Sequence, residues 1–165
     1  MKKVKTAIGD IFEVNLDGSS KKYFQYIAND ITQLNSDVIR AFKKVFPIEA
    51  NPDFFEIVTS EVEFYAHCVI KWGIKMEQWK KVGHVPYVGK TEILFRDTND
   101  AARKIGEESV KVSSNWYVWK INEEFRHVGK LEGENRKAEI GLVISPINIV
   151  HRMRAGKYSF IYPSF

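Results

Sequence analysis

The sequence predicts an α+β fold: a strongly curved antiparallel sheet, or a partly open small barrel, with one or two short helices packed on it. Three observations support this prediction. Segments with alternating apolar residues recur along the chain, an Asp-Gly pair marks an early tight turn, and few segments show helical periodicity. At 165 residues the chain has the size of one domain, and no linker, repeat or low-complexity tract divides it. We therefore expect a single globular domain over residues 1–165.

The first predicted element is a β-hairpin. Every second residue from Phe12 is apolar, through Val14 and Leu16, which is the period of a strand with one buried face. Asp17 and Gly18 suit the tight turn that follows, and residues 21–28 return with aromatic side chains on both faces. Segment 37–46 is ambiguous, because its apolar residues fit either a strand or one face of a helix.

The clearest strand lies around the single cysteine of the chain. Alternate residues on one side are all apolar: Val62, Phe64, Ala66, Cys68 and Ile70. Because successive side chains of a strand point to opposite faces, we expect Cys68 in the core and His67 on an outward, mixed surface. The two side chains would then be too far apart to act as nucleophile and base. A buried cysteine keeps its proton and is unreactive.

Later elements are predicted from glycine, proline and capping residues as well as from hydrophobic periodicity. We expect a loop with a helical turn over 47–61, strands over 91–97 and 115–121, a helical turn over 100–106, a polar loop over 130–139 and a closing strand over 157–162. The best-marked helix follows Ser145, a capping residue, begins at Pro146 and stops at Gly156.

Composition and charge narrow the function classes. One cysteine cannot form an internal disulfide, no apolar run is long enough to cross a membrane, and the N-terminus lacks a signal-peptide core, so we expect a cytoplasmic protein without a membrane partner. The net charge of +4 is concentrated near the C-terminus, at Arg136, Lys137, Arg152, Arg154 and Lys157. This segment leaves weak nucleic-acid binding open, but a solvated basic surface is the favoured interpretation, because the surplus is small.

Catalytic motifs are absent from the sequence. The four histidines are scattered singly, and the chain contains no P-loop, no GxGxxG and no GxSxG, so we assign no cofactor, metal ligand or catalytic residue. One polar set, Glu124, Arg126 and His127, could form a site, although a surface ion pair is the favoured interpretation. The sequence thus favours a binding protein over an enzyme.

Four short segments carry a family resemblance. They are GDIFEV at 9–14, YFQYI at 23–27, VIRAF at 38–42 and FYAHCVI at 64–70. Over residues 7–85 this pattern resembles the bacterial immunity protein 26 family, which is associated with polymorphic toxin systems. The resemblance implies a small cytoplasmic protein that binds and neutralises a cognate toxin. Some members carry the label phosphotriesterase, which implies the alternative of a hydrolase with a polar site near His127.

A docking surface for such a partner can be predicted from exposed aromatic residues, because interfaces favour them. Two tryptophans follow the outward face of the cysteine strand within a dozen residues. The predicted partner-binding residues are Glu63, Tyr65, His67, Trp72 and Trp79, with Glu63 at the rim. The alternative, that both tryptophans belong to the core, stays open.

Overall fold

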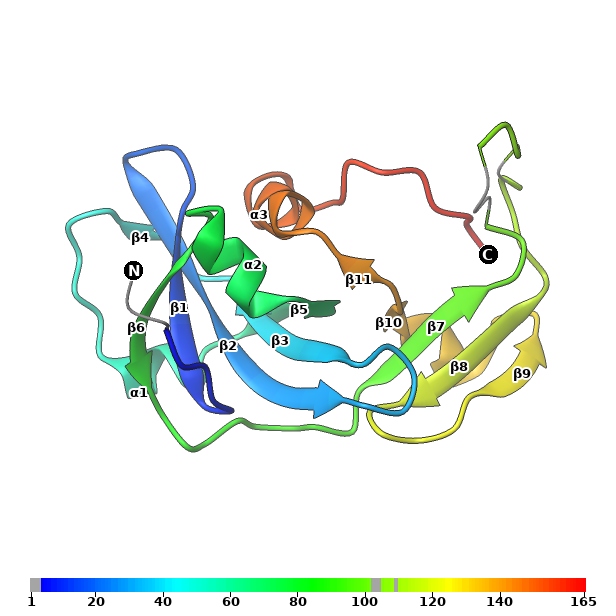
Figure 1. Cartoon of the computed structure of the whole chain (residues 1–165), viewed down its shortest axis with the longest axis horizontal. Helices are drawn as coiled ribbons and strands as arrows, with labels where there is room; N and C mark the ends of the chain where they lie inside the picture. Colours follow the sequence, from blue (N-terminus) through cyan, green and yellow to red (C-terminus); the bar gives the residue numbers. More distant parts are fainter. Residues whose placement is uncertain (1–3, 102–104, 109) are drawn as a thin grey trace.

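The computed structural model describes residues 4–101, 105–108 and 110–165, which form two mostly antiparallel sheets and three short α-helices (Figure 1). The large sheet contains β1 (Asp10–Asn15), β2 (Ser20–Asp30), β3 (Ser36–Phe42), β4 (Phe46–Pro47), β5 (Val62–Cys68), β6 (Lys80–His84) and β11 (Val143–Ile144). The small sheet contains β7 (Leu94–Thr98), β8 (Trp116–Lys120), β9 (Arg126–Gly129) and β10 (Glu139–Ile140). The helices are α1 (Phe54–Val58), α2 (Ile70–Lys75) and α3 (Pro146–Ala155).

The α+β prediction is confirmed, with two differences. The strand order of the large sheet is β11-β5-β3-β2-β1-β6, with β4 beside β2, and that of the small sheet is β10-β7-β8-β9. Neither order returns to its first strand, so the strands form two open sheets in place of one curved sheet or barrel. The described residues also form three α-helices where one or two were expected.

The N-terminal hairpin follows its sequence pattern. The carboxylate of Asp17 accepts hydrogen bonds from the backbone N–H groups of Ser19 (2.9 Å) and Ser20 (2.8 Å), and Gly18 has φ 85°. The ambiguous segment after residue 36 is the strand β3, which pairs with β2 on one side and β5 on the other. Pairing on both sides favours the strand, because each backbone group then has a partner within the sheet.

Both faces of the large sheet are covered, which corrects one prediction. Helices α2 and α3 lie on one face (Figure 1), over a core that includes Phe24 and Phe64. On the other face, α1 covers one half, and Phe95 and Trp119 of the small sheet cover the other half. The prediction that His67 faces outward is therefore wrong, since its side chain is completely buried between the two sheets.

A short crossover segment joins the two sheets. Strand β10 pairs in parallel with β7, and β11, three residues later, pairs in parallel with β5. Between them the N–H of Gly141 donates to the carbonyl of Arg96 (2.7 Å), and a side chain at position 141 would collide with the ring of Trp119. Glycine therefore lets the backbone pass close to the core of the small sheet.

The C-terminal helix is confirmed, whereas the closing strand is not. Ser145 accepts a hydrogen bond from the N–H of Asn148 (3.3 Å), and Gly156 ends α3 with φ 77°. The segment 157–162 bends repeatedly and pairs with no described strand, and its alternate aromatic side chains pack on the cores of both sheets. The helical turn predicted over 100–106 falls largely on 102–104, outside the described residues.

A buried hydrogen-bond network centred on Asp30 holds the two sheets together. Its Oδ2 lies 2.9 Å from Nε2 of His67 on β5 and accepts from Nε1 of Trp119 on β8 (3.0 Å). Its Oδ1 accepts from the backbone N–H of Asn122 (3.1 Å). All three side chains of this network are at least 97% buried, with exposures of 0% for Asp30 and His67 and 3% for Trp119.

The network predicts how stability responds to acid. Burial lowers the pKa of the His67 imidazole below its ordinary value, against the opposing effect of Asp30. The unfolded chain therefore takes up a proton near pH 6.5 that the folded chain resists. The free energy of unfolding should fall below that pH by at most about 1.4 kcal/mol per pH unit. Urea unfolding at pH 7 and pH 5 measures this fall.

The variant His67→Gln should lose part of this acid sensitivity, because it removes the titrating group and keeps a polar side chain. His127→Gln, at an exposed position, is the matched control and should keep the wild-type pH dependence. Equal pH dependence in wild type and His67→Gln would contradict the role given to His67.

Candidate functional site

The cysteine that first suggested a nucleophile is a core residue, as predicted. Cys68 is completely buried, and its side chain packs in the cluster beneath α2 and α3, on the face of the sheet opposite to His67. Burial, together with the nearby charge of Asp37, raises the pKa of the thiol well above its ordinary value. A thiol held in this form is neither a nucleophile nor a metal ligand.

The five residues predicted to bind a partner do not share one surface. His67 and Trp79 are buried, and Glu63 and Tyr65 are half-buried, with Glu63 paired to Lys22 (2.8 Å). Only Trp72 is widely exposed, at 64%. The prediction of a common exposed patch is therefore wrong in its geometry.

Trp79 is buried because the chain turns back after α2. Its indole N–H donates to the carbonyl of Ile70 (3.0 Å), and its ring lies against Gly73 and edge-on to Phe24 at 5.0 Å. The glycine inside the short helix is the sequence signal that could have indicated this contact, since a side chain there would occupy the space of the ring.

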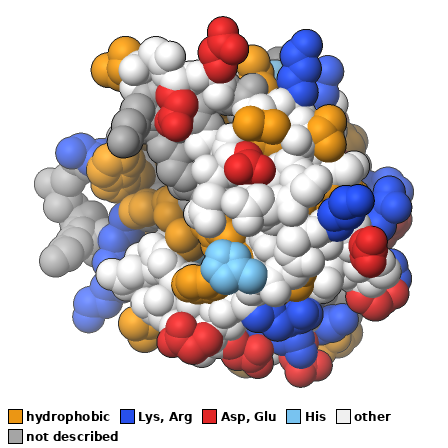
Figure 2. Space-filling model, turned by 90° about the vertical axis from the view of Figure 1, so that its right-hand side faces the viewer, with side chains coloured by type: hydrophobic (Ala, Val, Ile, Leu, Met, Phe, Trp, Pro, Cys, Tyr) orange, Lys and Arg blue, Asp and Glu red, His pale blue; other side chains and the backbone are white. Residues whose placement is uncertain are grey.

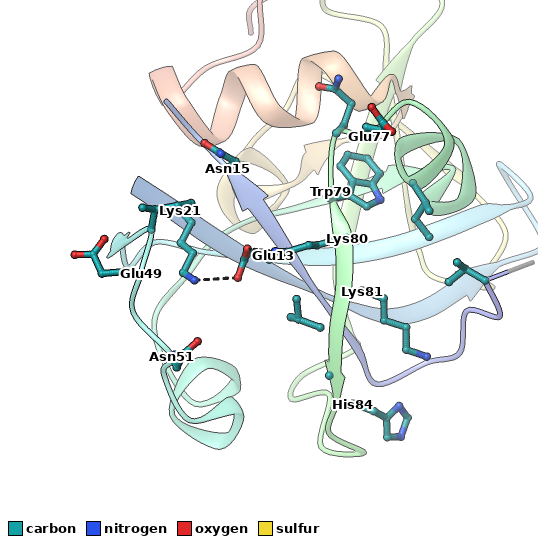
Figure 3. A pocket seen from close by; sticks show the side chains of 16 residues that line it. Glu13, Asn15, Lys21, Glu49, Asn51, Glu77, Trp79, Lys80, Lys81 and His84 are labelled. Carbon is teal, nitrogen blue, oxygen red and sulfur yellow. Dashed lines mark hydrogen bonds and ion pairs between the residues drawn. The ribbon is translucent and has the colours of Figure 1, made fainter. Parts of the chain in front are cut away.

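An open cleft with a volume of about 1310 Å³ lies beside β6 (Figure 3). One wall is β6 itself, the opposite wall is the loop 48–51, and the end of α2 closes one end. The polar side chains around it are Glu13, Asn15, Lys21, Glu49, Asn51, Glu77, Gln78, Lys80, Lys81 and His84. These residues come from separate segments of the N-terminal half, so no local sequence motif could predict the cleft.

An ion-pair network forms the floor of the cleft. The carboxylate of Glu13 accepts from Lys21 and Lys80, both at 3.0 Å, and from the hydroxyl of Tyr23 at 3.2 Å. Burial raises the pKa of Glu13, but its bonds to the two lysines outweigh this effect, and the pKa lies below its ordinary value. Glu13 is therefore ionised at neutral pH and neutralises cations on both sides.

A second carboxylate fastens the far end of β6. Asp10 is completely buried and accepts from Lys81 (2.8 Å), from the N–H of Ala7 (2.8 Å) and from Nδ1 of His84 when that nitrogen carries a proton (2.9 Å). Burial raises its pKa, yet these donors outweigh burial and lower it overall. The ion pairs thus tie β6 to β1 from both ends.

Strand β6 is an edge strand. It pairs with β1 on one side, and its outer edge pairs with no other strand of residues 4–101, 105–108 and 110–165. An unpaired edge presents backbone N–H and C=O groups in the spacing of a sheet and is a template for another extended segment. The cleft therefore combines an open hydrogen-bonding edge with charged walls.

A second, smaller hollow of about 230 Å³ lies on the small sheet. Its walls include the rings of Tyr117, Phe125 and His127, and Asp97 lies among the lining residues. Figure 2 views this end of the molecule and shows a histidine at the surface with hydrophobic side chains beside it. The sequence pattern predicted a strand over 115–121 but not this hollow.

The polar set predicted near His127 is not assembled as one site. His127 lines the small hollow, whereas Glu124 is not among its lining residues. Arg126 donates to the side-chain oxygen of Asn135 (3.2 Å), in the short 3-10 helix Gly133–Lys137 before β10. Within the described part of the chain, no group of three or more His, Cys, Asp or Glu side chains could hold a metal ion.

The basic C-terminal residues contact other parts of the protein. Arg152 pairs with Glu139 (3.4 Å) and lies over the rings of Phe64 and Tyr158. Three of the other four cations of this segment also have partners: Lys137 pairs with Glu134, Arg136 lies over Phe165, and Arg154 donates to the carbonyl of Asn15. Much of this charge is thus engaged within the fold.

Comparisons with protein-family models, curated proteins and solved structures give no significant match for this chain. No helix among the described residues has the length and apolar character needed to cross a membrane.

The state of the cysteine can be tested directly. Cys68→Ala should lower the free energy of unfolding by about 1 kcal/mol, as a small truncation in the core does. In native wild type, the thiol should react slowly with Ellman's reagent at neutral pH and rapidly after addition of urea. Rapid reaction of the native protein would contradict the buried position.

The two tryptophans form a matched pair for the second test. Trp79→Ala should lower the free energy of unfolding by about 3–5 kcal/mol, because it empties a core site and removes the hydrogen bond from the indole to the carbonyl of Ile70. Trp72→Ala should change it by less than about 0.5 kcal/mol, as surface substitutions do. Chemical denaturation measures both values, and equal losses would contradict the assigned burial.

Proposed function

We propose that this chain is a protein-binding module that neutralises a toxin, the role implied by its resemblance to the immunity protein 26 family. The cleft beside β6 carries the proposal. Its volume of about 1310 Å³ exceeds the roughly 300–1,000 Å³ of typical small-molecule sites and suits a segment of a protein. A binding protein of this kind needs a complementary surface and no catalytic residues.

The edge strand suggests how a partner segment would bind. An extended peptide can add a strand to an exposed sheet edge, with backbone hydrogen bonds providing affinity and side-chain contacts providing specificity. The outer edge of β6 is the available edge, and residues Trp79–His84 all line the cleft.

The charges of the cleft favour a basic partner segment. Lys80 and Lys81 are engaged by Glu13 and Asp10. Glu49 and Glu77 also line the cleft, both are exposed, and neither forms an ion pair with a described residue. Unpaired acidic groups on the walls attract cations, so a positively charged segment would fit here although the whole chain carries +4.

The test uses a secreted toxin candidate encoded beside the gene of this chain. Co-expression should protect cells from that protein, and the two proteins should co-purify. Asn51→Trp, at an exposed position on the loop wall, would fill part of the cleft and should weaken binding at least about tenfold, as loss of a central contact does. Calorimetry measures the affinity.

Lys157→Trp provides the control, because it places the same ring at an exposed position after α3, outside the lining of the cleft. It should leave binding unchanged, and both variants should keep the wild-type melting temperature. A complex that forms equally well with Asn51→Trp would contradict the cleft as the docking site. Failure of the neighbouring protein to bind wild type would contradict the toxin proposal.

A further inference from the structure

We propose that Glu77 is the specificity-determining residue of the cleft beside β6, where its carboxylate binds the guanidinium or ammonium group of a docked segment. The inference rests on the proposed function, because it takes the cleft as a docking site for a segment of a protein. It does not require that this segment belong to a toxin. Residues 77–84 line the cleft without a break, so a segment that lies along the cleft reaches Glu77 beyond the start of β6.

Glu77 has an unusual backbone conformation. It follows Met76, the C-cap of α2, and has φ 55°, in the left-handed region. Its N–H donates to the carbonyl of Ile74 (3.1 Å), and the N–H of Gln78 donates to that of Gly73 (2.8 Å). These two bonds form the Schellman motif, in which the left-handed position is usually a glycine. The helix thus ends in a common motif but has a glutamate where glycine fits best.

A glutamate at this position lowers the stability of the free protein for two reasons. In the left-handed region Cβ of an L-residue crowds the following carbonyl oxygen, a contact that glycine avoids and asparagine tolerates. The other described non-glycine residues with positive φ, Asn35 and Asn122, are both asparagines. In addition, the acidic side chain follows the carbonyl end of α2, where cations are favoured. Glycine would avoid both costs.

No contact within the described chain offsets these costs. Glu77 is exposed, and its carboxylate forms no ion pair or hydrogen bond with a described residue. The lysines that line the cleft are already paired with the carboxylates of Glu13 and Asp10. Residues that break a local rule without a gain in the fold are expected at functional sites. The position of Glu77 on the cleft gives it such a function, which is to bind a partner's cation.

The second unpaired acidic residue of the cleft, Glu49, lacks this signature. It lies on the loop wall, and its backbone is not in the left-handed region. Figure 3 shows it across the cleft from Glu77, with Glu13 and Lys80 between them. Glu49 therefore adds to the negative charge of the walls, whereas the selection of a particular side chain is assigned to Glu77.

The chemistry of the carboxylate favours arginine in the docked segment. A guanidinium presents two parallel N–H donors that match the two carboxylate oxygens, whereas an ammonium group is a point charge. Because Glu77 is exposed, water screens the pair and limits its strength. We therefore expect a preference for a charged over a neutral side chain of about two- to fivefold in affinity.

The experiment uses the peptide RTVTVTR, blocked at both ends, and the same peptide with citrulline, the neutral isostere of arginine, in place of both arginines. Arginine stands at both ends so that either strand direction brings one to Glu77. In NMR titrations the arginine peptide should shift the backbone amide signals of residues 77–84 saturably. It should bind about two- to fivefold more tightly than the citrulline peptide.

Three variants separate the charge from the backbone conformation. Glu77→Gln removes the charge and keeps the crowded backbone, so the preference for arginine should disappear. Glu77→Gly should lose the same preference and melt about 2 °C higher than Glu77→Gln, because it also relieves the crowding. Glu132→Gln is the matched control, since Glu132 is exposed and lies outside the lining of the cleft, and it should keep the wild-type preference.

Four results would overturn the inference. They are equal affinity of wild type for the two peptides, no shifts with either peptide, an unchanged preference in Glu77→Gln, and a lower melting temperature of Glu77→Gly than of Glu77→Gln. The proposed function fails separately. If the neighbouring protein does not bind while the peptides behave as expected, the toxin proposal is wrong and the role of Glu77 stands. If it binds wild type but the peptides show no preference, the reverse holds.

Discussion

The carboxylate of Asp30 is the interaction on which the arrangement of the two sheets depends. It lies at the end of β2, yet its hydrogen-bond partners come from β5, β8 and the loop after β8. A completely buried carboxylate is costly unless donors surround it, and here the donors from the small sheet can reach it only when that sheet is docked. The same contact therefore satisfies the charge and fixes the relative position of the sheets.

Docking of the small sheet also explains which sequence predictions succeeded. The alternation around Cys68, the turn at Asp17 and the caps of α3 are local signals, and the structure follows each of them. Alternation distinguishes the two faces of a strand but cannot reveal that both are covered. His67 was misplaced for this reason, because its burial depends on Asp30 and Trp119, which lie 37 and 52 residues away (67 − 30 and 119 − 67).

The two hollows could not be predicted from the sequence, for a related reason. The walls of the cleft come from β1, β6, the end of α2 and the loop 48–51. The hydrophobic pattern of each segment indicates only which of its own residues are buried. Trp79 illustrates the difficulty. An aromatic residue next to two lysines is typical of an exposed binding residue in the sequence, and only the structure shows that its ring packs against Gly73. The hollow on the small sheet arises in turn partly from a strand pattern that equally fits a core.

The cleft beside β6 and the hollow on the small sheet are stabilised by different interactions. At the cleft, Glu13 and Asp10 bind the lysines of the short edge strand β6, so the strand is fastened to β1 while its outer edge stays open. At the hollow on the small sheet, Trp119 links the lining to the Asp30 network, because its ring stacks on Tyr117 while its N–H donates to Asp30. The geometry of this hollow thus depends on the contact between the sheets, whereas that of the cleft depends on pairing within the large sheet. Loosening of the Asp30 network would therefore disturb the hollow on the small sheet before the cleft.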